Sequence, residues 1–208
     1  MILIVMGPQG SGKGTQATIL SKKLSIPHIS TGEILRTAEG RMKKRIEKKT
    51  SKGRLIKNKL MLRLLKKRIS QPDCNEGFIL DGYPRNLKQS KTLSKKIGFD
   101  KIIEIRISNK IAIKRLTGRR HCGKCGEGYN LNVKSLKPKN NEICNKCKIK
   151  LSKRKDDNKE AIKKRLNTYY KKTKPLLEKY QEKVISVDGE RSINKVANEI
   201  LEKLKKEN

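Results

Sequence analysis

A glycine-rich loop near the start of the chain is the feature that most constrains the fold. Residues 7–15 read GPQGSGKGT, between an apolar run at residues 2–6 and a segment whose apolar residues recur at helical spacing. Glycines let the backbone aim several N–H groups at one anion, and a helix that begins there adds the positive end of its dipole. Glycines also make ordinary turns. The strand-to-helix context and the charge of Lys13 nevertheless favour a cradle for the phosphates of a nucleoside triphosphate.

Apolar runs alternate with segments of helical spacing along the rest of the chain. We expect strands at residues 2–6, 26–29, 78–81, 102–107 and 184–187, and helices between them, the penultimate of which ends before Pro175. This alternation predicts an α/β fold, a doubly wound parallel five-stranded sheet with helices on both faces. Ligands of such sheets lie outside the carboxyl ends of the strands, so the glycine loop, Asp81 and Arg85 should share one crevice.

Two segments differ from the rest in composition and are predicted to be insertions at the rim of that crevice. Residues 30–59 are basic and poor in large apolar side chains over most of their length. Residues 119–157, which we call the cysteine segment, hold four of the five cysteines. The core domain would then consist of residues 1–29, 60–118 and 158–208.

The chain is strongly basic. Its 208 residues include 54 Lys and Arg against 20 Asp and Glu, a formal net charge of +34. Such a field attracts polyanions, so nucleic-acid binding is a serious alternative. The basic residues are spread along the whole chain, however, and aromatic residues make up only 3%, which leaves few platforms for stacking bases. We therefore expect solvated basic faces and no specific nucleic-acid partner.

Targeting signals are not evident in the sequence. No apolar run approaches the roughly 20 residues that cross a membrane, and Met1 leads directly into the first apolar run. We expect no membrane segment and no cleavable leader, and hence a cytoplasmic protein, which we take to be a monomer.

Two CxxC pairs, with eighteen residues between the inner cysteines, are formed by Cys122, Cys125, Cys144 and Cys147. Four thiolates at this spacing can close a tetrahedral zinc site, whereas disulfides are disfavoured in a reducing cytoplasm and redox chemistry needs only one pair. A closed four-sulfur site has no open position for a substrate, so its role would be structural. His121 adjoins the first cysteine and could compete as a ligand, but we take it as a bystander, and Cys74 as a packed side chain.

Arginine is used sparingly in this lysine-rich chain, and its planar guanidinium pairs bidentately with phosphate. A single arginine is usually a solvated side chain, yet seven fall in the rim segments or near strand ends. They are Arg36, Arg85, Arg115, Arg119, Arg120, Arg154 and Arg165. Asp81 ends an apolar strand beside the glycine loop. There it would hold Mg²⁺ through water, a role that we favour over a turn cap.

Together these motifs resemble those of the adenylate kinases, in the long form with a zinc-bearing lid. The resemblance runs from the first strand to the last helix. It is carried by GKGT at 12–15, ISTG at 29–32 followed by Arg36, DGYPR at 81–85, GRR at 118–120, RKDD at 154–157 and RL at 165–166. The family's loop reads GxPGxGKGT, so Pro8 and Gln9 depart from its usual order, as Lys57 and Lys59 depart from its usual residues in the AMP pocket.

The resemblance implies roles for the matching residues. ATP would be bound by Gly10, Ser11, Gly12, Lys13, Gly14, Thr15, Arg115, Arg119 and Arg191. AMP would be bound by Thr31, Arg36, Leu55, Ile56, Lys57, Gly82, Arg85, Gln89, Arg154 and Arg165, with Gln89 reading the adenine. The catalytic set would be Lys13, Arg85, Arg119, Arg154 and Arg165. Residues 30–59 would be the AMP-binding insertion, and residues 119–157 a lid whose return hinge carries Asp156 and Asp157.

The implied reaction is reversible transfer of the γ-phosphoryl group of Mg-ATP to AMP, giving two ADP. Both insertions would close over the nucleotides to exclude water. One alternative is a related kinase that acts on UMP, CMP or GMP, although the long cysteine segment and Gln89 favour AMP. A second alternative, from a different class, is a zinc-ribbon ATPase that binds nucleic acid.

Overall fold

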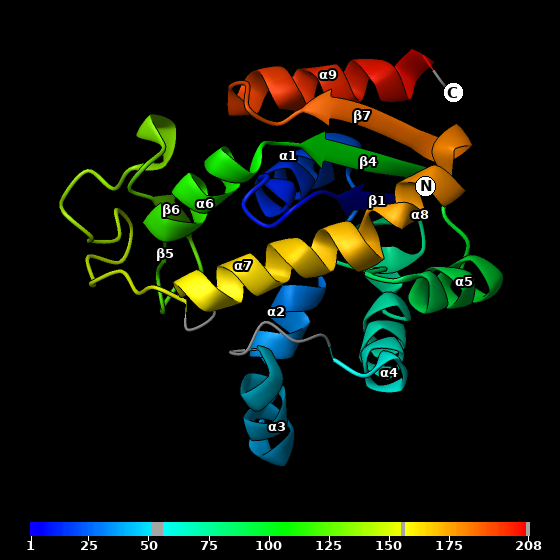
Figure 1. Ribbon diagram of the computed structural model, residues 1–208, viewed down its shortest axis with the longest axis horizontal. Helices are drawn as coiled ribbons and strands as arrows, with labels where there is room; N and C mark the ends of the chain where they lie inside the picture. The colour runs from blue at the N-terminus through cyan, green and yellow to red at the C-terminus, as the bar shows by residue number, and fades with distance from the viewer. Residues whose placement is uncertain (51–55, 155–156, 207–208) are drawn as a thin grey trace.

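The computed structural model describes residues 1–50, 56–154 and 157–206. Five of its strands form one parallel sheet: β1 (Ile2–Met6), β2 (His28–Ser30), β3 (Phe78–Asp81), β4 (Lys101–Arg106) and β7 (Val184–Asp188). Their order in the sheet is β2-β3-β1-β4-β7, so the chain visits one side of β1 before it crosses to the other (Figure 1). The expected five-stranded parallel sheet is confirmed, and β1, which ends in the glycine loop, lies at its centre.

The helices of the described residues are α1 (Lys13–Leu24), α2 (Thr31–Arg36), α3 (Gly40–Thr50), α4 (Asn58–Ile69), α5 (Leu87–Lys96), α6 (Asn109–Gly118), α7 (Lys159–Thr168), α8 (Pro175–Lys179) and α9 (Ile193–Lys206). Short 3-10 turns span Pro72–Cys74, Lys134–Leu136 and Gln181–Lys183. Among the residues that the structure describes, no helix is long and apolar enough to cross a membrane.

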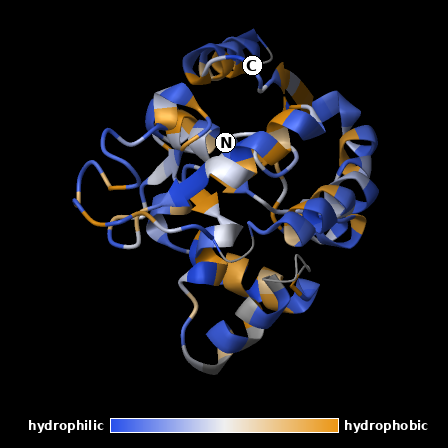
Figure 2. Cartoon of the chain, turned by 60° about the vertical axis from the view of Figure 1, so that its left-hand side comes forward, coloured by the Kyte–Doolittle hydropathy of each residue, from blue (hydrophilic) through white to orange (hydrophobic). Residues whose placement is uncertain are grey.

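Both faces of the sheet are covered, because successive side chains of a strand point to opposite faces. Ile4 and Met6 of β1 pack with side chains of α4, α5 and α8, whereas Leu3 and Val5 pack with side chains of α1 and α9. All four of these strand residues are at most 3% exposed. Strands buried on both faces are apolar at every position, which is why they stand out in the sequence. In Figure 2 the hydrophobic stretches lie on the strands and inner helix faces, beneath hydrophilic helix surfaces.

The helix expected to end before Pro175 is α7, which ends at Thr168, as predicted. After α7 the chain continues through one π-helical turn, Tyr169–Thr173, directly into α8. The N–H of Lys174 donates to the carbonyl of Tyr169 at 2.9 Å. Because Pro175 occupies the first turn of α8, where an N–H has no helical partner, the proline is tolerated there.

Two parts of the chain extend away from the sheet (Figure 1). Helix α3 projects beyond α2, on the side opposite to α9. The cysteine segment contributes a separate antiparallel ribbon of β5 (Arg119–His121) and β6 (Gly128–Asn130), and a bridge between His121 and Ser152 ties its return strand to this ribbon. Both parts lie apart from the sheet itself.

Candidate active site

The glycine loop connects the central strand to α1, and its backbone requires glycine. Gly7 has φ +148°, and a Cβ there would lie 2.4 Å from the carbonyl oxygen of Ile105. Gly10 and Gly12 have φ +86° and +95°, conformations that other residues rarely adopt. Helix α1 begins at Lys13 without a side-chain cap, so the N–H groups of its first turn are left to bind an anion.

The side chain of Lys13 folds back over the glycine loop, so that its ammonium group contacts the start of the loop. Its Nζ donates to the carbonyl oxygens of Gly7 and Pro8 at 2.9 and 2.8 Å. Burial lowers the pKa of Lys13 to about 8; the charge of Asp81 opposes this shift, while three arginines add to it. Those arginines are Arg85, Arg165 and Arg119. The structure thus brings four of the expected catalytic cations to one place.

The carboxylate of Asp81 lies beside the loop at the end of β3. A Cβ added to Gly14 would be 3.4 Å from Oδ2 of Asp81, and the Thr31 hydroxyl donates to the Asp81 carbonyl oxygen at 3.1 Å. The Nε2 atom of His28 lies 3.6 Å from the same carboxylate. Burial alone would raise the pKa of Asp81, but the facing His28 ring and the charge of Lys13 outweigh it and lower the pKa. An ionised carboxylate beside a phosphate cradle fits an outer-sphere ligand of Mg²⁺.

A buried carboxylate joins two of the arginines. Arg119, the first residue of β5, donates to both oxygens of Asp157 in a bidentate pair, with an Nε–Oδ2 distance of 2.7 Å. Arg165 of α7 donates to Oδ1 of Asp157 at 3.3 Å. Asp157 is only 1% exposed. Because both guanidinium groups bind this carboxylate, Asp157 fixes the position of a cation from the cysteine segment relative to one from the core.

Arg85 and Gln89 belong to a second network. Nε of Arg85 donates to the Gly82 carbonyl oxygen at 2.6 Å, which leaves the far end of the guanidinium near Thr31. The backbone N–H of Arg85 donates to Oε1 of Gln89 at 2.7 Å. Thr173, in the π-helical turn, donates its hydroxyl hydrogen to the Arg85 carbonyl oxygen at 3.0 Å. The backbone of the loop after β3 is thus fixed at Arg85 by Gln89 on its N–H and by Thr173 on its carbonyl.

Other expected contact residues lie around this centre. Arg115 donates from Nη1 to the carbonyl of Gly189 at 2.9 Å, which links α6 to the loop after β7. Arg191 pairs with Glu199 at 2.8 Å, so its side chain points along α9. Burial lowers the pKa of His121, and the charges of Arg154, Arg36 and Arg119 lower it further. The charges of Arg36 and Arg154 therefore act at the start of the cysteine segment, where Arg119 also lies.

The residues expected to line the AMP pocket differ in how far they are buried. Thr31 is 1% exposed, Ile56 is 8% exposed and Gly82 adjoins Arg85, whereas Lys57 is exposed immediately before α4. Leu55 and Asp156, also predicted as site residues, lie outside the described residues.

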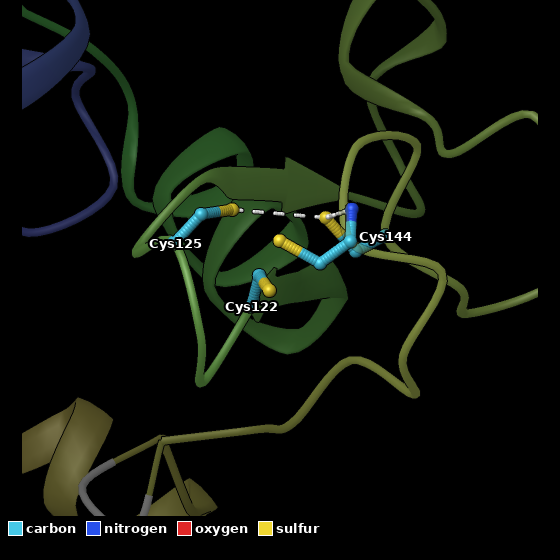
Figure 3. A group of neighbouring side chains, drawn as sticks. Cys122, Cys125 and Cys144 are labelled. Carbon is cyan, nitrogen blue, oxygen red and sulfur yellow. Dashed lines mark hydrogen bonds between the residues drawn. The ribbon is translucent and has the colours of Figure 1, made fainter.

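The four predicted metal ligands converge (Figure 3). The thiol sulfurs of Cys122, Cys125, Cys144 and Cys147 all lie within 4.8 Å of one another. No disulfide joins them; the Cys125 and Cys144 sulfurs are 3.8 Å apart, for example. Four thiols at this separation fit a tetrahedral Zn²⁺ ion, whose bonds to sulfur are about 2.3 Å long.

Two similar turns present these thiols. In the first turn the N–H of Cys122 donates to Glu127 and the N–H of Gly126 to Cys122; in the second the N–H of Cys144 donates to Ile149 and that of Lys148 to Cys144. The residue after each CxxC has positive φ, +72° at Gly126 and +57° at Lys148. The cysteine segment therefore contains two matching turns, at residues 122–127 and 144–149, which we call the first and second knuckle. The second knuckle carries Lys148 at a position where glycine would be unstrained.

The pKa values of Cys144 and Cys147 are shifted in opposite directions. Hydrogen bonds from the Tyr129 hydroxyl and from the N–H of Cys147 lower the pKa of Cys144 to about 6. Hydrogen bonding to Cys125 and burial raise the pKa of Cys147 to about 12. A thiolate at Cys144 is thus available to a cation, while the thiol of Cys147 resists ionisation in the absence of one.

Sequence reasoning missed three residues that support this site. They are His28, which faces Asp81; Asn58, which binds the Gln89 amide; and Thr173, which binds the Arg85 carbonyl. His28 is the last residue but one of the strand predicted at 26–29, and this position was a usable signal, because ligands lie at the carboxyl edge of such sheets. The other two had no signal, since their partners are far away in the sequence.

Comparisons with known proteins identify the family. A family model described as adenylate kinase matches residues 5–185. The chain is 40% identical over 217 residues to the adenylate kinase of Clostridium tetani, covering 96% of each chain. It is 42% identical over 211 residues to that of Desulforamulus reducens, covering 97% of this chain and 98% of the relative. The adenylate kinase of Methanocella arvoryzae is 40% identical over 99% of both chains. On this evidence, together with its sheet and glycine loop, the chain belongs to the adenylate kinase family.

Proposed function

We propose that this chain catalyses reversible transfer of the γ-phosphoryl group of Mg-ATP to AMP, giving two ADP. Family membership supports the reaction class. The observation that carries the proposal is the convergence on Lys13 of charge from three arginines of different segments, beside a glycine loop. They are Arg85 after β3, Arg119 at the start of β5 and Arg165 in α7.

Phosphoryl transfer requires positioning and positive charge more than covalent chemistry. The loop N–H groups, from Gly10 to Thr15, would hold the ATP phosphates, and Lys13 would exchange its carbonyl partners for phosphate oxygens. The clustered guanidinium groups would stabilise charge that develops on the transferred group. Asp81 would hold Mg²⁺ through water, and the ion, when bound, offsets phosphate charge.

We assign the AMP side of the crevice to residues around the loop after β3. The guanidinium of Arg85 and the hydroxyl of Thr31 meet at Gly82, so they would bind the AMP phosphate together. Arg36, Arg154 and Arg165 would complete the phosphate clamp. Gln89 would read the base, with Ile56, Lys57 and Leu55 lining the pocket, while Arg115 and the backbone at Arg191 would contact the ATP adenine.

The cysteine segment would act as a lid stabilised by zinc. Its four thiols would hold the ion, which supplies a cross-link that replaces a hydrophobic core. The segment begins with Arg119 and returns at Asp157, and these two residues pair. A folded segment would therefore carry its arginine to the phosphates as it closes, and closure would exclude water from the γ-phosphoryl group.

A coupled assay for ADP formation tests the reaction. We expect rapid ADP formation from ATP and AMP together with Mg²⁺, and little from ATP alone. Equal ATP consumption with and without AMP would overturn the proposal. The same assay with UMP, CMP and GMP tests the related kinases, because faster turnover of one of these would reassign the substrate.

The charge of +34 keeps a nucleic-acid role as a second candidate. We propose that the basic surface has no specific nucleic-acid partner, and that the protein works as a cytoplasmic monomer. Binding to RNA that is weak, falls steeply with salt and leaves the kinase rate unchanged is the expected result. Tight binding at physiological salt that stimulates ATP hydrolysis would favour the nucleic-acid role instead.

A further inference from the structure

A chain of amide hydrogen bonds links the start of α4 to α5. Gln89, which is 4% exposed, donates from Nε2 to Oδ1 of Asn58 at 2.9 Å. Asn86, the N-cap of α5, donates from Nδ2 to the same oxygen at 3.3 Å. The side-chain oxygen of Asn58 thus accepts two hydrogen bonds, one from Asn86 and one from Gln89. Gln89 lies 31 residues after Asn58 in the sequence.

Backbone donors fix the direction of this chain. The atom of Gln89 that faces the N–H of Arg85 at 2.7 Å must be its oxygen, because a backbone N–H cannot accept. By the same reasoning the N–H of Gln89, 2.9 Å from Asn86, faces the oxygen of that amide. Both NH₂ groups therefore point to Asn58. A flipped Gln89 amide would oppose donor to donor at Arg85 and acceptor to acceptor at Asn58.

We infer that Asn58 is a positioning residue that fixes the polarity of the Gln89 amide and thereby sets selectivity for AMP over 6-oxopurine nucleotides. The inference rests on the proposed function, in which Gln89 faces the base of the acceptor nucleotide. Arg85 uses one lone pair of the Gln89 amide oxygen, and Asn58 uses one N–H of its nitrogen. The Gln89 amide therefore keeps one acceptor site and one donor for the base.

That remaining pair matches adenine and not hypoxanthine. Adenine presents an amino donor at N6 and an acceptor at N1, whereas hypoxanthine presents a carbonyl acceptor at O6 and a donor at N1. To pair with hypoxanthine the Gln89 amide must flip, against both Asn58 and the Arg85 N–H. Removal of the Asn58 acceptor abolishes one of these two obstacles and leaves the other.

The experiment measures kcat/KM for AMP and for IMP, which differ at the purine 6-position edge and not in the phosphate or ribose. Asn58→Leu removes the acceptor and is expected to lower the AMP-to-IMP ratio about tenfold, the effect of one hydrogen bond. Asn58→Asp keeps an acceptor oxygen and is expected to retain the wild-type ratio within about twofold. Asn167→Leu, at an exposed asparagine of α7, is the matched control and should leave the ratio unchanged.

Each outcome separates this inference from the proposed function. An Asn58→Leu protein whose kcat/KM falls equally for AMP and IMP shows a merely structural role and overturns the inference. Failure of the wild type to phosphorylate AMP overturns the proposed function itself. Gln89→Leu should also lower the ratio, and an unchanged ratio there overturns the premise that Gln89 reads the base. If Asn58→Leu does not fold, Asn58→Ala removes the same acceptor without adding volume.

Discussion

The sheet core and the cysteine segment are built by different physics within one chain. In the core, apolar side chains fill both faces of the sheet, and residues such as Leu3, Ile79 and Leu80 are fully buried. The buried cluster of the cysteine segment consists of Cys122, Tyr129, Cys144 and Leu151, with Cys147 packed against it. Most of these side chains are thiols. A region too small to bury an apolar core would therefore depend on bonds to the proposed cation, whereas the sheet depends on apolar burial.

Loss of the cation should have the largest effect, and it should be confined to the cysteine segment. Structural zinc binds zinc-finger peptides with about 10–16 kcal/mol. In Cys144→Ser we expect less bound zinc and unfolding of residues 119–154 at lower temperature, with turnover less affected in the cold. Zinc content, calorimetry and hydrogen exchange measure this. Cys74→Ser, at a buried cysteine outside the cluster, should keep the metal. An unchanged melting curve in Cys144→Ser would contradict the comparison.

Truncation of a buried side chain in the sheet should destabilise the core and leave the cysteine segment unchanged. Leu80 of β3 is fully buried between the sheet and the helices that cover it. Leu80→Ala should lower the free energy of unfolding of the core by about 2–5 kcal/mol, because it leaves a cavity. Denaturant unfolding measures the loss, and zinc content should stay the same. Loss of zinc in this variant would show that the two regions are not independent.

Arg119 should connect the two regions functionally. Arg119→Gln removes a preorganised cation, so kcat/KM should fall on the order of 10²–10³-fold, or about 2.7–4 kcal/mol of transition-state stabilisation. The next residue offers a control, because Arg120 pairs with Glu142 within the cysteine segment. Steady-state assays of Arg120→Gln should show nearly wild-type turnover. Equal losses in the two variants would mean that charge alone, not position, matters.

The glycine loop should show a pH dependence that the cysteine segment does not explain. Lys13 has a pKa lowered to about 8, and bound phosphate favours the charged ammonium. Above pH 8 the free protein holds neutral Lys13, so ATP binding must take up a proton and affinity should fall up to about tenfold per pH unit. Calorimetry in buffers of different ionisation enthalpy measures this uptake. In Lys13→Arg the remaining affinity should not change over the same pH range.

The smallest expected effect lies in the second knuckle. Lys148 has φ +57°, where its counterpart in the first knuckle is Gly126. Lys148→Gly relieves this strain and should raise the free energy of unfolding of the cysteine segment by at most about 1 kcal/mol, which a slightly higher melting temperature would report. Gly126→Lys should lower this free energy by a similar amount. A destabilised Lys148→Gly would show that the two knuckles are not equivalent.

Much of the fold could be predicted because it depends on local patterns. Strands β3 and β7 lie within a residue of the apolar runs that predicted them. In β3 the first three residues are buried, so no polar alternation obscures the run. The path of the chain after α7 could not be predicted in this way. Proline usually ends a helix, but here a π-helical turn precedes Pro175 and the chain remains helical.

The sequence by itself determined where the candidate chemistry lies: a glycine loop suited to phosphates, four thiols spaced for a metal, and arginines near strand ends. These depend on residue type and short spacing, which are local properties. Only the tertiary structure decided that Asp157 joins Arg119 to Arg165 and that the Gln89 amide donates a hydrogen bond to Asn58. Such contacts depend on how helices pack on the sheet, and partners 31 or 38 residues apart leave no trace in a local pattern.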